Sequence, residues 1–333
     1  MPGTRIGLLG VRSSVSTHTA DDDPADGPQD TGRRDPRDFR DRDSSIAVNS
    51  YTTVRRRDTV QHERFAAYWR DVHGPLCARV PGLGWYVQHH FARQQDSHLW
   101  PAPDGVDPVP GYVLDGAVEI GFASTDDQAV FQEASPILFS DEQNVFEETV
   151  AYDLPHGSAT YTDRLPDPVP NGPDRVDRVH VHLTPRPGAQ DALRSFLADE
   201  LAPAFAADPL VLRLRLHQPA PHDNSTPNPP APRVRHEVPD ERVALSVLEV
   251  AFATSLDRRR FFASDTYTDT LAGQVAHASH VTAFPVVGVH TFVRDGRLTT
   301  AGLRGSRVAE LVTDLAALNQ VGPEVRALFA PAG

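Results

Sequence analysis

Glu119–Phe131 (EIGFASTDDQAVF) and Glu249–Phe261 (EVAFATSLDRRRF) are two versions of one sequence pattern. Each begins as an apolar strand and runs into a helix whose first residues carry hydroxyl side chains, the residue type preferred at helix N-caps. Each ends on a Phe that returns to the core. Agreement in residue type and order over the whole window indicates an internal duplication.

The same order of elements surrounds both windows. Each window is the third strand and second helix of a β-α-β-β-α-β series, the split βαβ unit of the ferredoxin-like fold. The expected first series is strand 45–53, helix 65–76 with Asp58 or Thr59 as N-cap, strands 84–93 and 115–123, a helix from Ser124 and strand 148–161. The expected second series is strand 176–183, helix 189–205, strands 210–218 and 243–253, helix 255–279 with a break and strand 281–293, followed by a helix at 306–320.

The sequence therefore predicts an α+β protein built from two tandem ferredoxin-like repeats. The expected organisation is a disordered tail rich in Asp and Arg (1–43), a first repeat (44–164), a linker (165–175), a second repeat (176–300) and a helical extension (301–333).

Composition excludes several functional classes. The net charge of -13 and the lack of a sustained basic stretch argue against a nucleic-acid partner. Every basic side chain apart from His is Arg, which excludes lysine Schiff-base chemistry. The one cysteine, Cys77, reads as a small core residue. No apolar stretch approaches the roughly 20 residues that span a bilayer, so no membrane partner and a cytoplasmic location are expected.

Common cofactor and hydrolase motifs are missing from the sequence. We find no G-x-G-x-x-G after a strand, no G-x-x-x-x-G-K-[ST], no G-x-S-x-G and no H-E-x-x-H. Dinucleotide, nucleotide triphosphate, serine-hydrolase and zincin mechanisms lack support, and no cofactor is expected.

One segment resembles a known family. Phe65–Leu76 (FAAYWRDVHGPL), continuing to Pro81–Leu83 and Tyr86–His90, resembles the EthD family of dimeric α/β barrel proteins, over about Ser45 to Thr162. The resemblance implies that two ferredoxin-like units pair into a barrel, here within one chain. Related barrels include cyclases, dehydratases, decarboxylases, isomerases and oxygenases, while others have no established catalysis, so the resemblance leaves the function to be decided by the site. The second half has no W-x-x-x-H-G-P counterpart.

Histidines of the first half are candidates for the chemistry. His73, the histidine of the family-type string, ends a helix, where an imidazole can either bind the last carbonyls or enter a pocket. On the next strand Tyr86, Gln88 and His90 share one face, and a polar face suits the pocket side of a barrel sheet. A hydrogen-bonded core histidine is the alternative for His90.

Histidines of the second half form another constellation. His180 and His182 alternate with apolar residues and so share one face of a strand, where His217 and His290 could join them. Such a pair could also chelate zinc, iron or copper if Glu249 or His217 converged on it, but the expectation is no metal.

These residues predict a cofactor-independent lyase or cyclase acting by proton transfer on an aromatic or polyketide-type molecule. A cofactor-less oxygenase and a non-catalytic small-molecule or haem binder are the alternatives. The expected partner is the substrate, with a homodimer also possible. The expected catalytic residues are His73, Tyr86, His90, His180 and His182, and the expected substrate-binding residues are Tyr51, Trp69, Gln88, His217 and His290.

Overall fold

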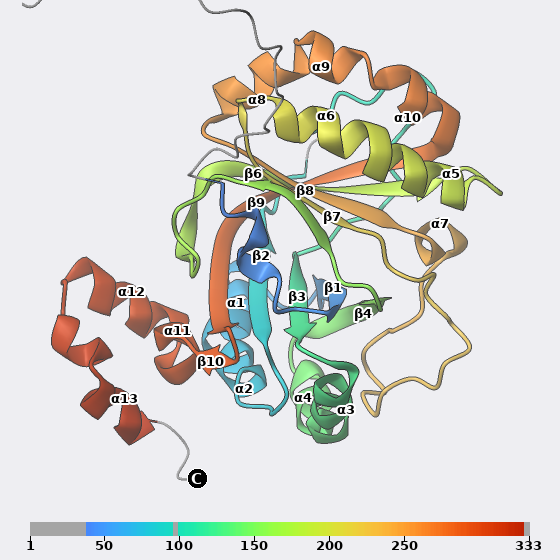
Figure 1. Cartoon of the computed structure of the whole chain (residues 1–333). Helices are drawn as coiled ribbons and strands as arrows, with labels where there is room; N and C mark the ends of the chain where they lie inside the picture. Colours follow the sequence, from blue (N-terminus) through green and yellow to red (C-terminus); the bar gives the residue numbers. More distant parts are fainter. Residues whose placement is uncertain (1–37, 96–98, 330–333) are drawn as a thin grey trace, which may run out of the picture. The chain divides into compact units, whose positions relative to one another are not determined.

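The computed structural model describes residues 38–95 and 99–329 (Figure 1). The described residues belong to one compact unit. Most of the segment expected as a tail therefore lies outside the described residues. Its last part forms the short 3-10 helix η1 (Arg40–Asp43), where buried Asp43 pairs with Arg294 at 2.6 Å.

The first repeat has the expected β-α-β-β-α-β order. Its first helical segment continues through a π-helical turn that carries Trp69 and His73 before it ends at Cys77. The elements are β1 (Val48–Arg56), α1 (His62–Tyr68), η2 (Trp69–His73), α2 (Gly74–Cys77), β2 (Trp85–Phe91), β3 (Gly116–Phe122), α3 (Thr125–Ala134), α4 (Pro136–Glu142) and β4 (Phe146–Leu154).

The second repeat follows the same order, and its last helical region is broken as the sequence predicts. The elements are β6 (Asn171–Pro185), α5 (Gln190–Ser195), η4 (Phe196–Leu201), α6 (Ala202–Ala207), β7 (Val211–His217), α7 (Asp240–Val243), β8 (Ser246–Phe252), α8 (Ser255–Phe262), α9 (Asp265–Thr268), α10 (Leu271–His277) and β9 (Ala278–Arg294). The chain continues with β10 (Arg297–Leu298), α11 (Thr300–Arg304), α12 (Ser306–Asp314), η5 (Leu318–Val321) and α13 (Pro323–Phe329).

One curled antiparallel sheet runs through both repeats, in the order β4-β1-β3-β2-β9-β6-β8-β7 and then β5 (Ala159–Asp163). Each repeat keeps the ferredoxin-like order, and the two are joined where β2 pairs with β9, with Gln88 opposite His290. The predicted fold class, α+β with tandem ferredoxin-like repeats, is confirmed. The sheet forms a half-barrel, in which β5 covers the outer edge of β7.

The strand expected at 148–161 is in fact two strands. β4 ends at Leu154, and a turn follows in which Gly157 adopts a positive φ of 71° and its N–H donates to the Leu154 carbonyl. A positive φ is easily adopted only by glycine. After this turn β5 leaves the first repeat and pairs with β7 of the second.

The duplicated windows have the same local structure. The Ser124 hydroxyl accepts a hydrogen bond from the Asp127 N–H at 3.1 Å, and the Thr254 hydroxyl accepts from the Asp257 N–H at 3.2 Å. The first helix differs from the expectation, because α1 begins after Gln61, which makes no side-chain cap, and not after Asp58 or Thr59.

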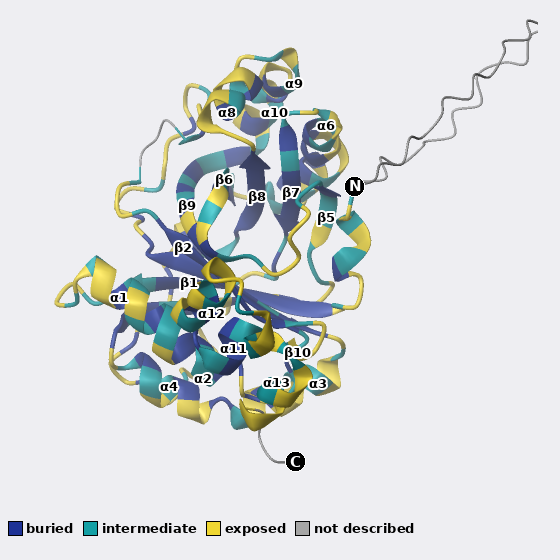
Figure 2. Ribbon diagram, turned by 90° about the vertical axis from the view of Figure 1, so that its left-hand side faces the viewer, coloured by how far each residue is buried: buried dark blue, intermediate teal, exposed yellow. Residues whose placement is uncertain are grey.

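Helices cover the outer face of the sheet in each repeat, while the inner faces of the two repeats pack against each other (Figure 1). Strands β2, β7 and β8 are accordingly buried on both faces, as Figure 2 shows. Polar side chains meet at this inner interface. Glu119 is 1% exposed and binds Arg215, while Glu249, its counterpart in the second repeat, binds Arg178 and Arg213.

Candidate functional site

A cavity of about 450 Å³ lies in the first repeat, between the outer face of the sheet and the helices that cover it. Its size falls in the range of small-molecule sites, roughly 300 to 1,000 Å³. Strands β1, β3 and β4 supply one wall and helices η2, α3 and α4 the other. Most of the lining is apolar, including the aromatic side chains of Trp69, Phe131, Phe139 and Phe146.

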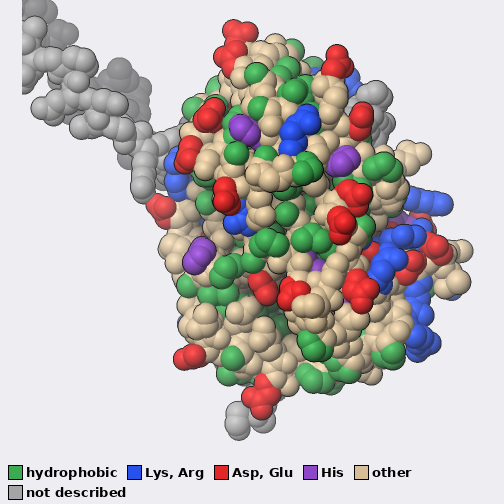
Figure 3. All heavy atoms as spheres, turned by 90° about the vertical axis from the view of Figure 1, so that its right-hand side faces the viewer, with side chains coloured by type: hydrophobic (Ala, Val, Ile, Leu, Met, Phe, Trp, Pro, Cys, Tyr) green, Lys and Arg blue, Asp and Glu red, His purple; other side chains and the backbone are tan. Residues whose placement is uncertain are grey.

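A loop of the second repeat, residues 219–239, completes this cavity. The Ala220 N–H donates to the Asp153 carbonyl at 2.8 Å, and the Thr149 N–H donates to the Arg235 carbonyl at 3.0 Å, so the loop lies along strand β4. Ala231 and Val234 of the loop are buried in the hydrophobic core of the first repeat. Figure 3 views the side of the molecule that carries this loop, where hydrophobic and acidic side chains are mixed.

His73 lines the cavity and is held by a carboxylate. Its Nδ1 lies 2.9 Å from Oδ2 of Asp141, whose Oδ1 accepts a hydrogen bond from the Tyr68 hydroxyl at 2.6 Å. Burial opposes ionisation of Asp141, but the hydrogen bonds from His73 and Tyr68 outweigh it and hold the pKa of Asp141 below its usual value. A donor Nδ1–H leaves Nε2 of His73 as the nitrogen available to a ligand.

Glu142, the next residue after Asp141, also lines the cavity. Its side chain is 7% exposed and its Oε2 is buried without a hydrogen-bond partner. Burial raises the pKa of Glu142 to about 7, with a smaller opposing effect from His73. A carboxyl group with this pKa can donate or accept a proton near neutral pH.

The raised pKa makes a testable contribution to stability. The folded state holds the Glu142 proton more tightly than the unfolded state, whose pKa is the ordinary 4.5. Between pH 4.5 and 7 the folded state therefore binds more protons, and stability falls as pH rises. At about 1.4 kcal/mol per pKa unit, the loss reaches about 3 kcal/mol.

We expect the free energy of unfolding of Glu142→Gln, relative to that of the unsubstituted protein, to rise by about 3 kcal/mol from pH 4 to pH 8. Urea unfolding across this pH range measures it. Glu133→Gln, a substitution at an exposed position of α3, is the matched control and should show no such trend. A pH-independent difference for Glu142→Gln would contradict the assignment.

Two more of the predicted residues line this cavity, whereas Gln88 and His90, predicted beside them, do not. Trp69 and Tyr86 line it, and the Tyr86 ring stacks on Phe292 at 5.1 Å. His90 stacks on Trp69 at 4.3 Å between ring centroids, while its Nε2 lies 3.0 Å from Oε1 of Gln88. Buried, and close to the imidazole of His290, His90 has a pKa well below its ordinary value.

The prediction that Tyr86, Gln88 and His90 face the barrel interior is wrong. They point to the helix layer, and His89 points inward, where its ring lies 4.5 Å from that of His180. Alternation along β2 cannot decide between two faces that both carry polar residues and are both buried.

His180 and His182 do share one face, as predicted, and Tyr51 of the first repeat joins them. The Tyr51 hydroxyl lies 2.8 Å from Nδ1 of His180 and 3.0 Å from Nε2 of His182. The His217 ring is 4.9 Å from that of Tyr51. His290 lies elsewhere, on the helix side, bound to the Ser306 hydroxyl at 2.8 Å.

This interior group has little room for an organic substrate. A space of about 40 Å³, lined by His89, Arg178 and Glu249 among others, lies beside it. Burial lowers the pKa of His180 and of His217 to about 3, which makes both imidazoles weak bases near neutral pH. The catalytic roles predicted for His180 and His182 remain predictions.

A tryptophan of the first repeat packs in the hydrophobic core of the second. Trp100, from the long loop after β2, donates from Nε1 to Oε1 of Gln274 at 3.0 Å. Its ring packs 5.5 Å from Tyr267 and 5.9 Å from Phe205. Each repeat thus extends a loop onto the other. The loop after β2 places Trp100 in the core of the second repeat, and the loop at 219–239 borders the cavity of the first.

Comparisons with known proteins find no matching family model and no matching curated protein. The resemblance to the EthD family therefore remains a resemblance. Similar solved structures include a "putative monooxygenase" from Fusobacterium nucleatum subsp. nucleatum ATCC 25586, at 6% identity and a TM-score of 0.47, covering 76% of this chain and 97% of that chain.

A second "putative monooxygenase", from Lactobacillus acidophilus NCFM, aligns at 8% identity and a TM-score of 0.42, covering 74% of this chain and 96% of that chain. An anthrone oxidase-like protein aligns at 11% identity and a TM-score of 0.43, covering 74% and 93%. Similarities at this level assign neither a family nor an activity. Among the described residues, no helix has both the length and the apolar character needed to cross a membrane.

Proposed function

We propose that this protein is a cofactor-independent enzyme that transfers protons on an aromatic or polyketide-type small molecule bound in the first-repeat cavity. Cyclisation, dehydration and decarboxylation are the reactions that such proton transfer serves. The observation that carries the proposal is Glu142, a buried carboxyl group with an unpartnered oxygen and a pKa of about 7 in a cavity of ligand size.

The cavity supplies the remaining requirements of this chemistry. Its aromatic walls, Trp69 and Phe146 among them, suit a flat apolar substrate and exclude water from the reacting atoms. In the proposed step, ionised Glu142 takes a proton from an acidic C–H or phenolic O–H of the substrate. His73, oriented by Asp141, is the second group that can carry a proton at the same cavity.

A bicyclic aromatic ketone tests the proposal directly. In D2O, the hydrogens next to the carbonyl of 1-tetralone exchange with solvent when a base removes them, and NMR follows the loss of signal. We expect the protein to accelerate this exchange above the buffer rate. Acceleration that also needed dioxygen, with uptake in proportion to ketone consumed, would instead support an oxygenase.

Blocking the cavity mouth should abolish the acceleration. Ala151 of β4 is exposed and lines the cavity, so Ala151→Trp places a large ring there and leaves Glu142 and His73 unsubstituted. Val287→Trp, at a β9 residue that is 50% exposed, is the matched control. Exchange at the buffer rate with the unsubstituted protein, or equal exchange by both tryptophan variants, would contradict the proposal.

A further inference from the structure

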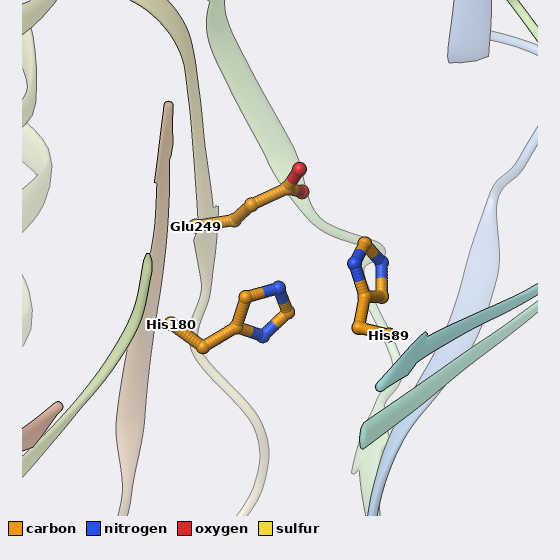
Figure 4. Close-up of side chains that lie close together, drawn as sticks. All are labelled: His89, His180 and Glu249. Atoms are coloured by element: carbon orange, nitrogen blue, oxygen red, sulfur yellow. The ribbon is translucent and has the colours of Figure 1, made fainter. Parts of the chain in front are cut away.

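Three metal-ligating side chains meet at the inner interface of the two repeats. His89 comes from β2 of the first repeat, and His180 and Glu249 come from β6 and β8 of the second. Their candidate ligand atoms all lie within 4.8 Å of one another, and all three residues are buried. Figure 4 shows the three side chains converging from these strands.

Both imidazoles have a ring nitrogen without a partner. Nδ1 of His89 and Nε2 of His180 are buried and make no hydrogen bond with the described part of the chain. Buried polar atoms are normally paired, because burying one without a hydrogen-bond partner destabilises the fold. Two unpaired ring nitrogens close to one carboxylate indicate a binding site for a cation, to which each nitrogen can donate its lone pair.

A hydrogen bond prepares His180 for such a ligand. Its Nδ1 lies 2.8 Å from the Tyr51 hydroxyl, so a proton on Nδ1 leaves the lone pair on Nε2. Metal-bound histidines are commonly oriented in this way by a hydrogen bond at the other ring nitrogen.

One carboxylate oxygen of Glu249, Oε2, is available to bind an ion. Its hydrogen bonds from Arg178 and Arg213 both arrive at Oε1. The two guanidinium groups also pair with Asp174 and Asp163, which offsets their positive charge near the cluster. The space of about 40 Å³ that His89 and Glu249 line has room for a water molecule beside an ion.

We propose that His89, His180 and Glu249 bind one divalent transition-metal ion of the zinc class, with water completing its coordination. Imidazole nitrogen and carboxylate oxygen bind Zn²⁺ at about 2.0 to 2.2 Å. The three side chains therefore move toward the ion by about an ångström when it binds. The ion links the two repeats across their interface. Its role is structural, because the adjoining space is too small for the substrate proposed above.

Metal titration of the full-length protein tests the inference. After removal of metal with EDTA, the protein is titrated with Co²⁺, whose visible absorption reports coordination by protein ligands, and with Zn²⁺ in competition with a chromophoric chelator. We expect one ion per chain, and a rise in the midpoint of thermal unfolding when the ion is bound. No binding, or only several weak sites per chain, would overturn the inference.

Variants of two residues on the same strand locate the site. His180→Ala is expected to weaken binding at least about 100-fold, because a ligand is lost. Thr184→Ala is the matched control, since the Thr184 hydroxyl donates to the Glu241 carbonyl at 2.8 Å and not to Tyr51 or a proposed ligand, and it should bind within a few-fold of the unsubstituted protein. Equal binding by His180→Ala and the unsubstituted protein would place the ion elsewhere and overturn the inference.

A second ligand variant covers the case in which His180→Ala does not fold. His89→Gln keeps a polar side chain of similar length and should lose the ion, with unchanged circular dichroism. Retained one-to-one binding in His89→Gln overturns the inference. The readout is independent of the proton-transfer assay, because the metal site and the cavity lie on opposite faces of the sheet.

Discussion

Replacing Glu142 by glutamine is expected to lower the proton-exchange rate with 1-tetralone by about 10²-fold to 10⁴-fold, the range typical of a general acid or base. Glutamine keeps the shape of the side chain and its place at the end of α4, but it has no carboxylate to accept the proton. The affinity for the ketone should change little, because the aromatic walls of the cavity are intact.

The pH dependence of the same reaction identifies the group. In the unsubstituted protein the rate is expected to rise through pH 7 as Glu142 ionises, and this rise should disappear in Glu142→Gln. Glu133→Gln on the exposed side of α3 should retain both the rate and the pH profile. A Glu142→Gln protein that exchanges protons at the original rate would exclude Glu142 as the base.

Replacing Glu119 by glutamine is expected to destabilise the fold by about 3 to 5 kcal/mol, the cost typical of removing one partner of a buried ion pair. Glu119 and Arg215 are 1% and 2% exposed, and they join the inner faces of the two repeats. Without the carboxylate, the Arg215 guanidinium keeps a buried positive charge with a weaker set of partners, Asp43 at 3.5 Å and the Thr160 hydroxyl at 2.6 Å.

Urea unfolding measures this loss, and a surface pair provides the comparison. Arg260 is 62% exposed and pairs with Asp257 at 3.2 Å, so Arg260→Ala should cost at most about 1 kcal/mol. If Glu119→Gln were as mild as Arg260→Ala, the interface between the repeats would not depend on this pair.

Local features were predictable where a short stretch contains all the interacting groups. The caps of α3 and α8 are examples, because the hydroxyls of Ser124 and Thr254 bind N–H groups only three residues away. The order of strands and helices was predictable for the same reason. The split between β4 and β5 was missed, although Gly157 marks the turn that separates them.

The candidate site was predictable only in part. His73, Trp69 and Tyr86 were identified from their motif and their places on a helix and a strand, and all three line the cavity. Glu142 was missed, because an acidic residue at the end of a short helix usually faces solvent. Its burial results from the cavity walls around it, which include β4 and the loop at 219–239.

The α+β duplication could be predicted from the sequence, because periodicity and helix caps depend on residues that are neighbours in the chain. The tertiary structure determines which histidines meet. His89, not His90, reaches His180, since the pairing of β2 with β9 turns that face of β2 toward the second repeat. It also determines what borders the first-repeat cavity, because the loop at 219–239 comes from the second repeat, while Trp100 of the first repeat packs in the core of the second. Contacts between residues this far apart in the chain depend on packing, which no local pattern encodes.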